Sequence, residues 1–167
     1  MKITRNFIDS VIIVLCVLAL ADALTFGLNF FAPQTMPKPR DAGLALRLKA
    51  HVFKLSEEIG ERNLEHYPQL EQAADYIASQ LGSYGYRVQS QDYILRGKRV
   101  RNIIARKSGS VLPNKVIIAG AHYDNVVAPG ADDNASGVAA VLELARLLRD
   151  KPSTMSIEFC FFTDEED

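Results

Sequence analysis

The stretch that decides the fold begins with KVIIAGAHYD at residues 115–124. Residues 116–119 form a continuous apolar run, which is typical of a strand that is covered on both faces. Apolar residues return at helical spacing between Ala135 and Leu148, and a second apolar run extends from Met155 to Phe162. Strand, helix and strand in this order predict a right-handed crossover between parallel strands, with the strand at 115–121 in the centre of the sheet.

The residues before this unit predict two helices and a hairpin. Apolar residues recur at three- and four-residue steps from Leu44 to Ile59, and Pro68 can open a second helix that ends near Gly82. Val88, Ser90, Asp92 and Ile94 then fall on one side of a possible strand, before a turn that contains Gly97. The sequence therefore predicts an α/β fold with a mixed, mainly parallel central sheet flanked by helices.

The first 32 residues predict a segment for export or membrane insertion. Lys2 and Arg5 precede an apolar run, and the triplet Ala21-Asp22-Ala23 suits cleavage by a signal peptidase. A membrane anchor is the alternative, although Asp22 near the middle of the bilayer would cost roughly 2.5–3.5 kcal/mol. Three prolines in residues 33–40 predict a semi-rigid linker, and residues 41–167 are expected to form the folded domain.

The composition limits the class of protein. With 48% apolar residues, 167 residues suffice for one ordinary domain. The net charge is −1, and the charges are mixed along the chain, so nucleic acid is excluded as a partner on this basis. The two cysteines, Cys16 and Cys160, fall in separate apolar runs and are not expected to pair.

Three polar clusters follow the predicted strands. They are His122-Tyr123-Asp124, the loop 130–137 and the acidic run 163–167. Since the carboxyl ends of parallel strands meet at one edge of a sheet, we expect these clusters to converge. An imidazole with several carboxylates is a ligand set for zinc, and the His-x-Asp spacing suits an imidazole oriented by a carboxylate.

Each cluster alone has a simpler interpretation. Asp132-Asp133-Asn134 could cap the following helix, since such side chains accept hydrogen bonds from free N–H groups there. Glu165-Glu166 could be a solvated loop, and His122 could be a hydrogen-bonded core residue. Their joint occurrence, in this order, favours the metal site.

The same motifs carry a family resemblance. The segments 121–124, 130–140 and 162–166 resemble the co-catalytic dizinc aminopeptidases, a group that includes glutamate carboxypeptidases and glutaminyl cyclases. Upstream segments also look like this family, so the likeness covers most of residues 44–167. The resemblance implies the sheet and flanking helices of the zinc exopeptidase, or phosphorylase/hydrolase-like, fold.

The resemblance further implies a ligand set for two zinc ions. His122 would ligate one ion, Asp132 would bridge both, and Glu166 would ligate the other. Asp133 would support the loop, in which the family often has a cis peptide bond after the bridging aspartate. The family uses two further ligands downstream, so we expect a chain that ends at Asp167 to be the N-terminal portion of the domain and to be inactive by itself.

The resemblance also assigns two catalytic positions. Glu165 would be the general base that activates a water molecule, and Asp124 would orient His122. The expected function is an extracytoplasmic aminopeptidase that acts on peptides, attached to a membrane if the N-terminal segment is not cleaved. The alternatives are a zinc acyltransferase like glutaminyl cyclase and a noncatalytic, membrane-tethered binding domain; the preferred side chain and the oligomeric state are not predicted.

Overall fold

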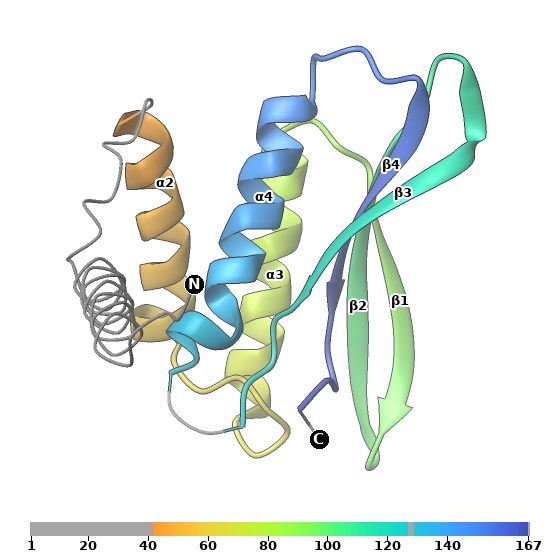
Figure 1. Ribbon diagram of the computed structural model, residues 1–167. Coiled ribbons are helices and arrows are strands. Elements are labelled where there is room, and N and C mark those ends of the chain that lie inside the picture. Colours follow the sequence, from red (N-terminus) through yellow and green to blue (C-terminus); the bar gives the residue numbers. More distant parts are fainter. Residues whose placement is uncertain (1–41, 127–128, 167) are drawn as a thin grey trace, which may run out of the picture. The chain divides into compact units, whose positions relative to one another are not determined.

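The structure of the protein is a computed structural model that describes residues 42–126 and 129–166 (Figure 1). The predicted N-terminal segment, 1–32, and the linker, 33–40, lie outside these residues, so both stay predictions. Among the described helices, none combines the length and the apolar character that crossing a membrane requires.

Four strands form one mixed sheet. They are β1 (Val88–Leu95), β2 (Lys98–Lys107), β3 (Leu112–His122) and β4 (Met155–Phe162), in the order β1-β2-β4-β3. β2 pairs antiparallel with β1 and with β4, whereas β3 and β4 pair in parallel. Three of these four strands therefore run in the same direction. This sheet confirms the predicted α/β fold, and the parallel β3–β4 pair confirms the predicted crossover.

The hairpin of β1 and β2 turns through two residues. Leu95 lies opposite Lys98, and between them Arg96 and Gly97 have φ angles of 46° and 80°. Positive φ at both central residues is the turn geometry that matches the twist of the flanking strands. Glycine adopts it without steric cost, which explains why Gly97 marks this turn in the sequence.

Helices cover one face of this sheet. α3 (Tyr67–Ser83) and α4 (Ser136–Leu148) pack on it, and α2 (Ala42–Phe53), continued by the π-helical turn η1 (Lys54–Ile59), packs against α4 (Figure 1). Pro68 lies in the first turn of α3, as predicted, where its missing N–H has no helical partner to lose. Large apolar side chains that are buried in this core include Leu70, Ile77, Leu81, Leu142, Phe159 and Phe161.

One prediction about the sheet is wrong for the residues that the structure describes. β3 is an edge strand, and β4 takes the central position that the sequence assigned to residues 115–121. Val116, Ile117 and Ile118 are exposed, Ile118 by 64%. The reason is that an apolar run indicates faces suited to burial and carries no information about which strands pair along its edges.

A buried polar cluster joins α2, α3 and α4. His51 of α2 lies within hydrogen-bonding distance of the Tyr76 hydroxyl on α3, with 2.6 Å between Nδ1 and the hydroxyl oxygen. Its Nε2 is 3.6 Å from the buried Glu143 carboxylate of α4. Glu143 also accepts hydrogen bonds from Arg47 and Arg146 at 2.9–3.0 Å. Burial lowers the pKa of His51 below its usual value of about 6.5, and the attraction of Glu143 only partly offsets this effect.

This cluster generates a prediction about acid stability. A histidine whose pKa is lower in the folded state stabilises the fold above pH 6.5 relative to lower pH, and that contribution is lost as the pH falls through the folded pKa. The groups that face His51 are Tyr76, Tyr84, Glu143, Arg47 and Arg146. We expect the unfolding temperature to fall more between pH 7.5 and pH 5 in the wild type than in His51→Gln, as measured by circular dichroism. Parallel pH curves for the two proteins would contradict this prediction.

Candidate metal centre

The register of β3 and β4 brings two of the predicted clusters together. His122, the last residue of β3, lies opposite Phe162, the last residue of β4. The Tyr123 N–H donates to the Phe162 carbonyl oxygen at 2.8 Å, which extends the pairing beyond the strands. Residues 122–124 and 163–166 are therefore held side by side at one edge of the sheet.

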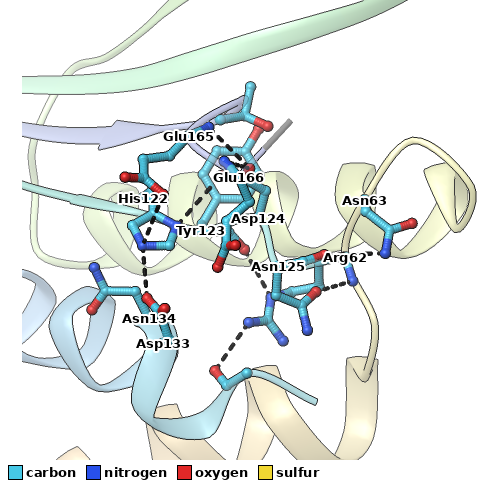
Figure 2. Close-up of polar contacts among 12 residues, drawn as sticks. Arg62, Asn63, His122, Tyr123, Asp124, Asn125, Asp133, Asn134, Glu165 and Glu166 are labelled. Atoms are coloured by element: carbon cyan, nitrogen blue, oxygen red, sulfur yellow. Dashed lines mark hydrogen bonds and ion pairs between the residues drawn. The ribbon is translucent and has the colours of Figure 1, made fainter. Parts of the chain in front are cut away.

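The His122 ring faces carboxylates with both of its nitrogen atoms (Figure 2). Nδ1 lies 3.6 Å from Asp124 Oδ1, while Nε2 lies 3.0 Å from Asp133 Oδ1 and 3.9 Å from Glu165 Oε2. A carboxylate that accepts from Nδ1–H selects the tautomer with a free lone pair on Nε2. In the structure, Nε2 lies within hydrogen-bonding distance of the Asp133 carboxylate, so His122 presents this atom to the carboxylates of the site.

Asp124 is buried and contacts both sides of the site. Its Oδ2 accepts hydrogen bonds from the main-chain N–H groups of Glu165 and Glu166, at 3.0 and 3.2 Å. Its Oδ1 and the Nδ1 of His122 are buried and have no hydrogen-bond partner among the described residues. These two atoms face each other at 3.6 Å. The Asp124 carboxylate thus holds the main chain of Glu165 and Glu166 and faces the imidazole of His122.

Three side chains form a group that could hold a metal ion. One potential ligand atom from each of His122, Glu165 and Glu166 lies within 4.8 Å of the other two. An imidazole nitrogen combined with carboxylate oxygens suits zinc, so the chemistry of these donors fits the metal that the resemblance implies. The Glu165 side chain is 62% exposed, which leaves its carboxylate accessible to water and substrate.

The two aspartates of the loop before α4 occupy different places. Both lie in η2 (Ala131–Ala135), but Asp133 is the one whose carboxylate contacts Nε2 of His122. Asp132 lines an adjoining pocket of about 660 Å³, together with Asp133, Glu166 and Glu57. The cis peptide bond joins Asp133 to Asn134, one position later than the resemblance implies. The assignment of the bridge to Asp132 stays a prediction, and Asp133 is the residue that the structure brings against the histidine.

The side chain of Asn134, rather than that of Asp132 or Asp133, binds a free N–H group at the start of α4. Asn134 Oδ1 accepts a hydrogen bond from the Gly137 N–H at 3.0 Å. The Ser136 hydroxyl donates to the main-chain carbonyl of Asp132 at 2.8 Å, not to its carboxylate. Asn134 therefore supplies the cap that the sequence allowed for all three residues 132–134, and the carboxylate of Asp133 is directed to His122 instead.

Comparison with known proteins agrees with these features. Residues 102–167 match the family described as Peptidase family M28. The chain is 36% identical to the uncharacterised protein YfbL of Escherichia coli strain K12 over 129 residues, which cover 72% of this chain and 39% of YfbL. It is 46% identical to the probable lipoprotein aminopeptidase LpqL of Mycobacterium tuberculosis over 71 residues, which cover 41% of this chain and 14% of LpqL. The chain thus spans well under two thirds of the length of these relatives.

Solved structures share the fold. The crystal structure of Bacteroides thetaiotaomicron glutaminyl cyclase bound to N-acetylhistamine matches with a TM-score of 0.60 and 27% identity, covering 74% of this chain and 46% of that one. The zinc aminopeptidase BSAP from Bacillus subtilis matches with a TM-score of 0.67 and 16% identity, covering 72% of this chain and 61% of that one. At 16% identity the likeness to BSAP shows the fold alone. Taken together, the family match over residues 102–167, the relatives and the fold support the assignment of this chain to peptidase family M28.

Proposed function

We propose that the protein is a zinc-dependent aminopeptidase that removes amino-terminal residues from peptides outside the cytoplasm. The observation that carries this proposal is the position of His122, whose Nδ1 faces a buried carboxylate while its Nε2 faces Asp133 and Glu165. The match to a peptidase family supports the hydrolytic reaction, and the similarity to LpqL, a probable lipoprotein aminopeptidase, supports both the aminopeptidase activity and an extracytoplasmic location.

We further propose how the chain's residues divide the metal-binding work between two zinc ions. His122 and Glu166 would hold zinc, and a loop aspartate would be shared between the two ions. Asp133 is our choice for the bridge because its carboxylate lies 3.0 Å from Nε2 of His122, whereas Asp132 is the choice that the resemblance implies. Zinc, when bound, polarises the scissile carbonyl and makes a water molecule acidic enough to ionise near neutral pH.

Glu165 is the proposed general base. Its exposed carboxylate lies 3.9 Å from the His122 ring, and its main-chain N–H is held by Asp124. A carboxylate placed this way can take a proton from the attacking water and pass it to the leaving amine. Asp124 holds the main chain of the base and faces the ligand imidazole, so it fixes their relative positions.

A glutaminyl cyclase-like acyltransferase is the second candidate. Its support is the 27% identity to the Bacteroides thetaiotaomicron enzyme over 74% of this chain. A cyclase closes a glutaminyl amino terminus on itself and releases ammonia, whereas an aminopeptidase releases the first residue. The reaction products therefore distinguish the two candidates.

An assay of the full-length protein tests the proposed function. We expect zinc-dependent release of free amino acids from a panel of unblocked aminoacyl-coumarin amides, loss of turnover with a chelator and its return with zinc. The same aminoacyl-coumarin amides with acetylated amino groups are the control, and they should not be cleaved. Ammonia release from glutaminyl peptides without free amino acid would instead establish the cyclase, and zinc binding without either product would indicate a binding domain.

The general-base role generates a second prediction. Glu165→Gln removes the basic oxygen with little change in shape, so it should lower kcat about 10²–10⁴-fold while zinc content is retained. Zinc would be counted by atomic emission on the purified proteins. Glu158→Gln is the matched control, because Glu158 lies on β4, the strand that leads to Glu165, and contacts Arg106 rather than the metal cluster. Retained turnover in Glu165→Gln would exclude the role.

The choice between the two loop aspartates generates a third prediction. Asp133→Ala should lower zinc stoichiometry, because it removes the carboxylate that faces His122. Asp132→Ala is its neighbour control and should retain more zinc. If Asp132→Ala loses zinc and Asp133→Ala keeps it, the bridge belongs to Asp132.

A further inference from the structure

Arg62 is a fully buried arginine between η1 and α3 that contacts the loops of the metal centre. Every described hydrogen-bond acceptor of its side chain is a main-chain carbonyl oxygen. These acceptors belong to Leu55, Gly60, Tyr123, Pro129 and Gly130, at distances of 2.7–3.2 Å. The rigid fork of a guanidinium group is suited to bind several acceptors at once.

These acceptors lie next to the residues that carry the metal ligands. Tyr123 directly follows His122, and Gly130 precedes Asp133 by three residues in the loop before α4. Arg62 also pairs with the chain between them: its N–H donates to Asn125 Oδ1, and the Asn125 N–H donates to the Arg62 carbonyl oxygen at 3.0 Å. A single residue therefore connects the strand end that carries the imidazole with the loop that carries the carboxylate (Figure 2).

The contacts leave little freedom to the guanidinium group. Burial lowers the pKa of Arg62 to about 10, with some compensation from the charge of Asp124, so the side chain remains protonated at neutral pH. A buried cation is costly unless it is hydrogen-bonded, so the five carbonyl groups must stay in their places around it. Lysine would keep the charge at this position but could not reproduce the fork.

Gly130 shows how closely the loop approaches Arg62. Its φ is +61°, and a Cβ atom at this position would lie 2.9 Å from Nη2 of Arg62 and 2.7 Å from the Asp133 carbonyl oxygen. Both the backbone conformation and the close contact therefore require glycine here. The loop reaches its position beside His122 while packed directly against the guanidinium group.

We infer that Arg62 is a positioning residue for the metal centre. Its side chain fixes the distance between the strand end that carries His122 and the loop that carries Asp133. This inference rests on the proposed function for the identity of the metal. Arg62 acts through the main chain, so it sets zinc affinity and turnover without touching metal or substrate.

The test compares Arg62→Lys with Arg146→Lys in the full-length protein. Arg146 is the matched control because it also donates to a mostly buried group, Glu143, but lies on α4 away from the loops of the metal centre. Zinc affinity is measured by competition with a chromogenic chelator well below the unfolding temperature. We expect Arg62→Lys to weaken zinc binding about 10–100-fold, as is typical when a partner of a ligand-bearing group is lost, and to lower kcat more than it changes KM. Arg146→Lys should lower only the unfolding temperature of the zinc-free protein.

A second variant covers the case in which Arg62→Lys does not fold. Gly130→Ala disturbs the same contact from the opposite side and should weaken zinc binding in the same direction. Wild-type zinc affinity in either folded variant would overturn the positioning role, and an active wild type would then leave the proposed function standing. A wild type that binds zinc but hydrolyses no peptide would overturn the proposed function, while the affinities would still decide the role of Arg62. A wild type that binds no zinc would overturn both.

Discussion

The parallel pairing of β3 with β4 is the constraint on which the rest of the site depends. It sets His122 opposite Phe162, and the hydrogen bond from Tyr123 extends the pairing to where both strands end. Because a parallel pair needs a long crossover, α4 and the loop before it must start at this edge. The imidazole, the acidic pair and the loop aspartates are consequently close in space although more than 40 residues separate His122 from Glu165 along the chain.

Most of the fold could be predicted because it is encoded in local patterns. Helical spacing, the position of Pro68 and the turn at Gly97 each depend on neighbours within a few residues, and the structure confirms all three. The place of β3 in the sheet could not be predicted in this way. An apolar strand can lie at the centre or at the edge of a sheet. Its position depends on which other strands pair with it, and its own sequence does not specify that pairing.

The site, like the fold, could be predicted only in part. The order of the motifs was enough to predict that His122, Glu165 and Glu166 meet, because strand ends define where their side chains emerge. Which of two adjacent aspartates faces the histidine depends on the backbone path of the loop. Asp133 has non-helical angles, with φ of −112° and ψ of 94°, inside a helical turn, and neither the spacing nor the type of the residues in this loop encodes that bend.

The role of Arg62 could not be predicted from the sequence for a related reason. Sequence patterns indicate which side chains can meet, but the partners of this side chain are carbonyl groups, which every residue carries. Glu143 is the contrasting case, since a buried carboxylate among two arginines and a histidine is satisfied by side chains. An ion-pair cluster like that of Glu143 can hold helices together through several alternative partners. A guanidinium group bound to five carbonyls fixes the main chain itself, and a metal site built on loops requires that kind of constraint because its ligands can be no more precisely placed than the backbone that bears them.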